Sequence, residues 1–251
     1  MKALFLFKVE NQKLILSNYF WIILALYAVL QVGLMPILST KAETVLNIQP
    51  ADVQPAVLTL AHYWIGGALK FLPAMIIIIS QSNEFEYKTI RQTIMDGWSK
   101  LEFVLSKTSG VLMVAALSVL VTLVASFASW RPGDPGSVDI TVRMLLSVGL
   151  FIEITTYLMI TLLITTIVRN PALVLVALGL LTAGEFLLVD DLESKWEGIS
   201  QYFPIYALNH PFEPGIKTGP LHFNFVTIQT SLMTMIGVLI LNVFYLKKID
   251  L

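Results

Sequence analysis

Six apolar runs, each long enough to cross a lipid bilayer, constrain this chain more than any other feature. A helix needs about 20 predominantly apolar residues to span the hydrocarbon core. The runs cover residues 19–38, 57–80, 108–129, 140–168, 171–189 and 225–246. Only 13% of the 251 residues are charged, against about 25% in a typical soluble domain, and the charges cluster between the runs. The sequence therefore predicts an all-α, polytopic membrane protein whose single transmembrane domain covers residues 1–251.

The distribution of Lys and Arg predicts which ends of the spans face the cytoplasm. Cytoplasmic loops carry an excess of basic residues in multispanning proteins. If all six runs cross, one side of the membrane holds Lys2, Lys8, Lys13, Lys88, Arg91, Lys100, Lys107, Arg169, Lys247 and Lys248. The other side holds Lys41, Arg131, Arg143, Lys195 and Lys217. Both termini are therefore expected in the cytoplasm, and a count of five or seven spans would put one of these loops on the wrong side.

Three segments outside the runs have readable features. Residues 1–17 place apolar and polar side chains on opposite faces of a helix, which predicts an amphipathic helix in the membrane interface; a cytoplasmic extension of the first span is the alternative. Residues 190–224 mix aromatic and apolar side chains, broken by Pro204 and Pro211, and they predict short helices that re-enter the outer membrane face. The short link Arg169-Asn170-Pro171 predicts a tight hairpin between the fourth and fifth spans.

Three charged residues fall inside the predicted spans. Lys70 lies in the second span and Glu153 in the fourth, at similar depths from the outer ends. A charge near the bilayer centre costs about 2.5–3.5 kcal/mol on insertion scales, so we expect the two to pair or to face a shared polar interior. The pair would either fix helix packing or take part in transport. Glu185, in the fifth span, is expected to line an outer vestibule. Pro36 and Pro73 can kink the first two spans.

Several classes of chemistry have no support in the sequence. The chain has no cysteine and a net charge of −1, so thiol chemistry is excluded and nucleic-acid binding is disfavoured. Its three histidines form no ligand pair at helical spacing. It contains no Gly-rich phosphate loop, no Gly-x-Ser-x-Gly sequence and no paired Asp residues within the spans. We therefore expect no catalytic residues, no metal site and no cofactor in this chain.

The most informative segment is cytoplasmic and joins the second and third spans at residues 81–107. It is charged and helix-forming, and Gly97 is its expected break. Ile90, Ile94 and Trp98 recur at helical spacing. On periodicity alone, an ordinary loop that keeps positive charge inside explains this segment equally well.

This segment also resembles the signature of the type-2 ABC transporter permeases. The family pattern is an acidic stretch, Gly-Thr-Leu/Ile-Arg/Glu, a few apolar residues, Pro-x-Ser-Arg, and a Lys that opens the next span. The matching residues here are Glu84, Glu86, Thr89, Ile90, Arg91, Ser99, Lys100 and Lys107. Lys88 stands where the family usually has Gly, and Gly97 where it often has Pro, which puts the local turn in doubt.

The likeness extends beyond this segment. Glu10 and Lys13 resemble part of the family's N-terminal amphipathic helix, and Tyr202-Phe203-Pro204 resembles its outer re-entrant region. The order of these features and the six-span layout agree over essentially the whole chain.

The resemblance implies the membrane half of an ATP-driven exporter. Two permease subunits, identical or paralogous, would face each other in a bacterial cytoplasmic membrane and contact its lipid. Each would dock a separate cytoplasmic subunit that binds ATP and Mg²⁺. The coupling residues carried over from the family, or chosen from the segment itself, are Glu84, Glu86, Thr89, Ile90, Arg91, Gly97, Trp98, Lys100 and Lys107. Trp98 is the expected aromatic anchor in a groove of the partner.

The substrate is not readable from the sequence. The compact chain favours a hydrophobic or amphipathic substrate such as a peptide, an antibiotic or a lipid. The alternative function is a stand-alone membrane channel, scramblase or sensor without an ATPase partner.

Overall fold

The structure is a computed structural model that describes residues 2–46, 55–87, 89–128, 140–196, 199–203 and 225–248. Within these ranges the regular structure is helical, without strands. The helices are α1 (Lys2–Ile15), α2 (Asn18–Leu46), α3 (Pro55–Ala68), α4 (Phe71–Glu86), α5 (Thr89–Met95), α6 (Lys100–Ala128), α7 (Ile140–Val168), α8 (Pro171–Glu193) and α10 (Phe225–Lys248). A 3₁₀ turn, η2 (Ile199–Tyr202), lies between α8 and α10 and contacts both.

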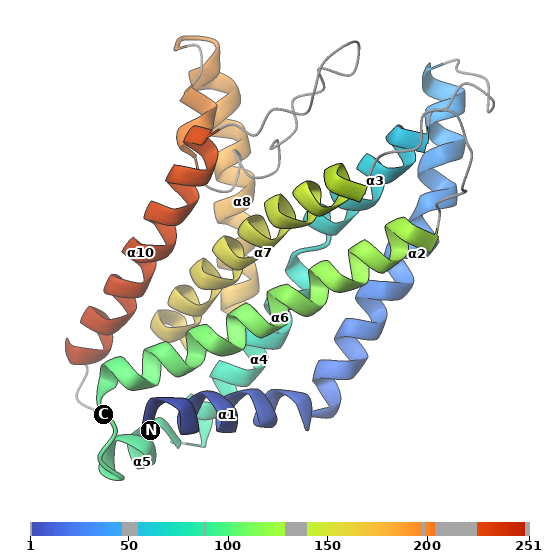
Figure 1. Ribbon diagram of the computed structural model, residues 1–251. Coiled ribbons are helices and arrows are strands. Elements are labelled where there is room, and N and C mark those ends of the chain that lie inside the picture. Colours follow the sequence, from blue (N-terminus) through green and yellow to red (C-terminus); the bar gives the residue numbers. More distant parts are fainter. Residues whose placement is uncertain are drawn as a thin grey trace.

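The helices form an elongated bundle, which confirms the predicted all-α class (Figure 1). Five segments of the described chain are long and apolar enough to cross a membrane: Ala61–Glu86, Lys100–Ala128, Ile140–Val168, Pro171–Val189 and Ile228–Lys248. A sixth is added if α1 and α2 are taken together, although Phe7–Ile15 and Asn18–Leu34 meet at an angle of 68°. This is the architecture of a multispanning membrane protein.

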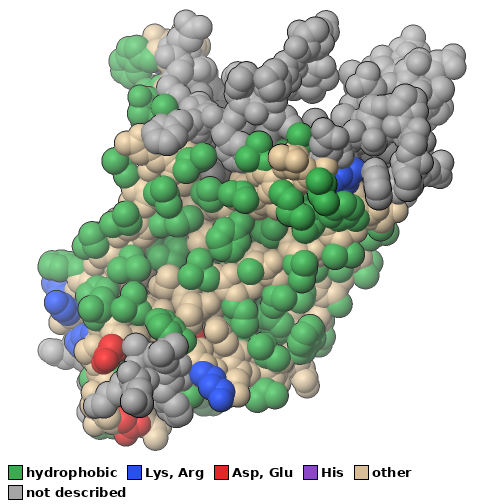
Figure 2. Space-filling model, in the orientation of Figure 1, with side chains coloured by type: hydrophobic (Ala, Val, Ile, Leu, Met, Phe, Trp, Pro, Cys, Tyr) green, Lys and Arg blue, Asp and Glu red, His purple; other side chains and the backbone are tan. Residues whose placement is uncertain are grey.

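The central helix of the bundle is α7, which packs against α3, α4, α6, α8 and α10. Its large apolar residues Leu146, Leu150, Ile154 and Leu158 recur every fourth position and are all buried, as expected for one face of a core helix. By contrast, α8 and α10 keep many large apolar side chains on the surface. Hydrophobic atoms cover the middle of the bundle, while acidic atoms and most basic atoms in this view gather at its lower end (Figure 2).

Two helices continue past the apolar runs from which the spans were predicted. The third span was expected to begin at Thr108, but α6 begins at Lys100. Ser99 and Glu102 form the cap that starts it: the Ser99 N–H and hydroxyl donate to Glu102 Oε2 at 2.9 and 2.8 Å, and the Glu102 N–H donates to Ser99 Oγ at 3.2 Å. This is a capping box. Because α4 also continues to Glu86, the separate helix between the spans shrinks to α5.

The second span was predicted as one helix, and the structure breaks it between α3 and α4. Proline at position 73 has no N–H to donate to the Leu69 carbonyl. That carbonyl accepts instead from the Leu72 N–H at 2.9 Å, and the Lys70 N–H donates to the Gly67 carbonyl at 3.2 Å. Both bonds join residues three apart, so the α-helical pattern is interrupted at Leu69 and Lys70.

The other sequence predictions have mixed outcomes. The expected N-terminal helix is present as α1, and α7 has the boundaries predicted for the fourth span. The hairpin between α7 and α8 turns at Arg169 and Asn170, as expected. Of the predicted outer segment 190–224, the described part is the end of α8, the turn after it, η2 and Phe203. Residues 204–224, where further re-entrant helices were expected, lie outside the described residues.

Candidate functional site: a buried charge cluster beside α5

Four charged side chains from three helices meet at the end of the bundle where α4 finishes and α6 begins. We call Glu10, Lys13, Glu84 and Lys107 the inner cluster. Lys107 Nζ lies 2.7 Å from Glu10 Oε1 and 2.5 Å from Glu84 Oε1, and Lys13 also donates to Glu84 Oε1. Glu10, Glu84 and Lys107 are buried, whereas the Lys13 side chain is 46% exposed. Two cations therefore balance two carboxylates, and each buried charge has an opposite charge beside it.

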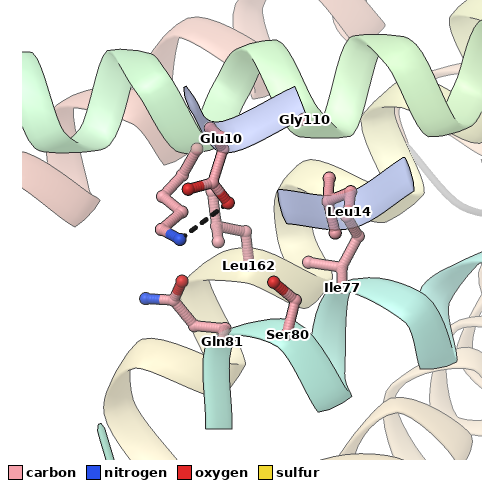
Figure 3. A pocket seen from close by; sticks show the side chains of 8 residues that line it. Glu10, Leu14, Ile77, Ser80, Gln81, Gly110 and Leu162 are labelled. Carbon is pink, nitrogen blue, oxygen red and sulfur yellow. Dashed lines mark hydrogen bonds and ion pairs between the residues drawn. The ribbon is translucent and has the colours of Figure 1, made fainter. Parts of the chain in front are cut away.

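The cluster exists because α1 packs closely across α6. Glu10 and Leu14 are one turn apart and face the same way, and both are buried. Gly110 lies one turn after Lys107 on α6, and a Cβ atom there would stand 2.9 Å from Leu14 Cδ1. A larger residue here would crowd the Leu14 side chain, so glycine favours the close approach of the two helices. The same packing brings the Glu10 carboxylate to Lys107 (Figure 3).

A small cavity lies beside the inner cluster. Its lining residues are Glu10, Leu14, Ile77, Ser80, Gln81, Lys107, Gly110 and Leu162, and its volume is about 10 Å³. The side-chain oxygens of Ser80 and Gln81 face the same space as the Glu10–Lys107 pair (Figure 3). A volume of this size holds about one water molecule. The inner cluster therefore joins three helices around a space of about the size of one water molecule.

The short helix α5 is held against the bundle by its own apolar core. Ile90 is 2% exposed and packs with Phe103, Val104 and Leu246, and Ile94 joins the edge of this group. Lys100 Nζ donates to the Leu246 carbonyl at 2.6 Å, so the start of α6 and the end of α10 meet next to α5. The segment between α4 and α6 is thus fixed to two candidate spans.

Gly97 ends α5, as the sequence predicted. It has a φ of +88°, in the left-handed region that glycine adopts without strain. The Gly97 N–H donates to the Ile94 carbonyl at 3.0 Å and the Trp98 N–H donates to the Thr93 carbonyl at 3.4 Å. These two bonds define a Schellman motif. Gly at this position, where the resembled family often has Pro, therefore closes a well-formed helix end.

The remaining predicted coupling residues lie around α5. The Thr89 hydroxyl donates to the Glu84 carbonyl at 3.3 Å, Glu86 is exposed and Trp98 is half-buried. Arg91 belongs to α5, but its side chain lies outside the described part of the structure.

Sequence reasoning missed two exposed side chains beside these residues. Tyr87 is 73% exposed and Met95 is 71% exposed. The exposure of Met95 could have been predicted from helical spacing, because Ile90 and Ile94 lie on one face of α5 and Met95 lies on another.

A second contact reaches this end of α4 from the α7–α8 hairpin. The Arg169 guanidinium lies 4.9 Å from the centre of the Phe85 ring, within the range of a cation–π contact. Arg169 has a φ of +59°. The Asn170 side chain then caps α8 by accepting from the backbone N–H groups of Ala172 and Leu173, at 3.0 and 3.3 Å. The turn between α7 and α8 therefore has a defined conformation, and it contacts α4 at Phe85, one residue before α4 ends.

A second buried charge site lies in the middle of the bundle. Lys70 Nζ is 3.0 Å from Glu153 Oε1, and both side chains are about 95% buried, being 6% and 5% exposed. The same ammonium lies 5.3 Å from the centre of the Tyr157 ring. We call Lys70 and Glu153 the mid-membrane pair, and the pairing expected from the sequence is present. Glu185 is half-buried on α8.

Comparisons with known proteins do not assign a family. No family model matches this chain, and no curated protein sequence is significantly similar to it. Within the described residues, no group of three or more His, Cys, Asp or Glu side chains is arranged to hold a metal ion. The function must therefore be argued from the inner cluster, the segment beside it and the resemblance carried by residues 84–107.

Proposed function

We propose that this chain is the permease subunit of an ATP-driven transporter. Residues 81–107 couple it to a separate cytoplasmic subunit that binds and hydrolyses ATP with Mg²⁺. The substrate is hydrophobic or amphipathic, such as a peptide, an antibiotic or a lipid. Two such permeases, identical or paralogous, form the complete membrane unit. The resemblance of residues 84–107 to the type-2 ABC permeases motivates this proposal, and the packing around α5 supports it.

One observation carries the proposal: α5 is linked to several helices at once. Its Ile90 packs on α6 and α10, and Thr89 bonds back to the Glu84 carbonyl of α4. Glu84 in turn joins α1 and α6 through Lys13 and Lys107. A flexible loop would change its own conformation when a partner subunit moves, and the movement would not reach the spans. A helix held by these contacts would transmit the movement of the partner to α1, α4, α6 and α10 together, as a rigid-body conformational change requires.

The surface that α5 and its neighbours leave open has the chemistry of a protein contact. Tyr87 and Met95 are large, largely apolar and more than two-thirds exposed. They lie beside exposed polar residues that include Glu86, Gln92 and Asp96. Aromatic residues and Met are enriched at protein interfaces. We infer that Tyr87 and Met95 enter an apolar groove of the ATP-binding subunit, with Trp98 supporting them from a half-buried position.

The orientation of the bundle follows from its basic residues. Several described basic residues belong to the end of the bundle that carries α5: Lys8, Lys13, Lys100, Lys107, Arg169, Lys247 and Lys248. Under the positive-inside rule, this distribution supports a cytoplasmic location for this end of the bundle. On α1, Glu10 and Leu14 face the bundle, while Val9, Ile15 and the following residue Leu16 are exposed. This arrangement suits a helix that lies in the inner membrane interface, with its exposed apolar residues in lipid.

Co-purification from native membranes tests the proposal. The tagged full-length chain is captured, and every protein that remains bound is identified and quantified. Met95→Asp places a charge on the exposed surface and should remove the ATP-binding subunit, as should Trp98→Ala and Arg91→Glu. Trp196→Ala is the matched control, because Trp196 is 63% exposed beyond α8, outside the coupling segment.

The outcomes separate the candidate functions. A stoichiometric ATP-binding subunit that is retained by Trp196→Ala and lost by Met95→Asp supports the permease. A chain that purifies alone and still moves ions or lipid in vesicles would instead be a channel or scramblase. A chain that binds an ATPase equally well after all the coupling substitutions would contradict the proposed docking surface.

A further inference from the structure

The break between α3 and α4 coincides with the mid-membrane pair. Lys70 is one of the two residues at the break, and its ammonium lies 3.0 Å from Glu153 on α7. The two halves stay aligned well enough that Ala61–Glu86 counts as one membrane-crossing segment of 26 residues. At Leu69 and Lys70 the backbone hydrogen bonds thus join residues three apart, in place of the α-helical four. The segment nevertheless stays straight enough to be a candidate membrane span.

Glu153 contacts the broken span at two points. Besides accepting from Lys70, its carboxylate lies against the backbone of Gly67, on the outer side of the break. A Cβ atom on Gly67 would stand 2.8 Å from Glu153 Oε1 and 3.0 Å from Oε2. The Glu153 carboxylate therefore pairs with Lys70 and packs against Gly67, so it lies beside the interruption and beside the end of α3.

The neighbouring residues make the break a weak point without Glu153. Gly66 and Gly67 precede it, and glycine lowers helix stability by about 1 kcal/mol relative to alanine. Pro73 follows it and removes a helical hydrogen bond. Discontinuous helices inside membranes mark positions where backbone can bend, and charged residues there serve transport or gating.

We propose that Leu69 and Lys70 form a hinge in the second span and that Glu153 latches it. When the carboxylate holds Lys70 and Gly67, α3 and α4 are fixed in line. When the contact to Lys70 is broken, α3 and α4, which both pack against α6 and α7, bend relative to each other at Leu69 and Lys70. The hinge divides the span into an outer half that moves and an inner half tied to the coupling segment. It is a property of this chain alone, so it holds whether or not an ATP-binding subunit is the partner.

Spin labels on the full-length protein in lipid nanodiscs test the hinge. The chain has no native cysteine, so labels attach only where cysteine is introduced. Met233 on α10 carries the reference label. A second label replaces Trp64 on α3 or Tyr87 at the end of α4, and all three positions are largely exposed. Double electron–electron resonance then measures the outer distance, Trp64 to Met233, and the inner distance, Tyr87 to Met233.

Substitutions at Lys70 or Glu153 are expected to change the outer distance distribution and not the inner one. Glu153→Gln and Lys70→Met should each broaden the outer distance distribution and leave the inner one unchanged. Glu10→Gln, which neutralises a buried carboxylate of the inner cluster, should leave the outer distribution unchanged. Pro73→Ala restores the missing N–H donor, and in the Glu153→Gln background it should narrow the outer distribution again.

Three results would overturn the hinge. If neither distance distribution changes in Glu153→Gln, the Glu153 carboxylate does not keep α3 and α4 in line. If both distances broaden together, or if Glu10→Gln broadens the outer one equally, the pair supports the fold in general. If the broadening persists after Pro73→Ala, it reflects lost packing and not bending at the break.

Discussion

The inner cluster and the mid-membrane pair both bury charge between helices, but they differ in redundancy. In the inner cluster, Lys107 has two carboxylate partners and Glu84 has two ammonium partners. One member, Lys13, also reaches solvent. In the mid-membrane pair, Lys70 and Glu153 form the one ion pair between their helices among the described residues, and both are buried.

This difference separates two uses of buried charge. Removing one member of a network leaves the others partly compensated, and nearby solvent can screen what remains. Removing one member of a fully buried ion pair leaves the opposite charge without that partner in a low-dielectric interior. We infer that the inner cluster tolerates change, as a joint that transmits motion must, whereas the mid-membrane pair, as long as it is intact, fixes one arrangement of its helices.

The largest expected effect is at the mid-membrane pair. Lys70→Met or Glu153→Gln alone should each lower the free energy of unfolding by about 3–5 kcal/mol, because the remaining partner is buried without its counterpart. The double variant should recover part of this loss. Unfolding in mixed detergent micelles, followed by circular dichroism, gives the double-mutant cycle. Losses that simply add would show that the two side chains are not energetically coupled.

A smaller effect is expected where Gly67 lies against Glu153. Gly67→Ala should destabilise the protein by about 1–3 kcal/mol, because the new methyl group must displace the carboxylate. Gly179→Ala is the matched control on α8, where a Cβ atom has no neighbour within 4 Å. That substitution should stabilise by up to about 1 kcal/mol, through helix propensity. Equal responses in the same unfolding assay would mean that Glu153 moves away from Gly67 at little cost.

The mid-membrane pair was predictable, and the reason is physical. A charge in an apolar run must find a partner, and two opposite charges at the same depth in two spans can meet without knowledge of any loop. The break in the second span was only partly predictable. Pro73 indicated a kink, and its missing N–H explains why the Leu69 carbonyl accepts from Leu72 instead. The close approach of Glu153 to Gly67, by contrast, depends on how α7 packs against α3 in three dimensions.

The inner cluster could not be found from the sequence. The apolar runs end at residue 80 and begin again at residue 108, so Glu84 and Lys107 read as surface charges of a loop. In the structure, α4 and α6 extend beyond those runs and carry both residues along the bundle. Glu10 joins them because Gly110 lets α1 approach α6. Apolar periodicity reports helix faces, but it does not report how closely two helices approach.

Within the inner cluster, the contact between Glu10 and Lys107 should contribute moderately. Glu10→Gln should lower stability by about 1–2 kcal/mol, because Lys107 keeps Glu84 and the new amide can still accept a hydrogen bond. The measurement is again unfolding in mixed micelles, with Glu153→Gln as the reference. A loss as large as that of the reference would remove the proposed difference in redundancy between the two sites.

The smallest effect is expected at Lys13, the exposed member of the inner cluster. Its side chain is 46% exposed, and an exposed ion pair is worth about 0–1 kcal/mol and is screened by salt. Lys13→Gln should therefore lower stability by no more than about 1 kcal/mol, and the difference from the natural protein should shrink as salt rises. Glu10→Gln, at a buried position, should show much less salt dependence. If Lys13→Gln instead costs as much as Glu10→Gln at every salt concentration, the Lys13–Glu84 contact is shielded from solvent, and the inner cluster is as closed as the mid-membrane pair.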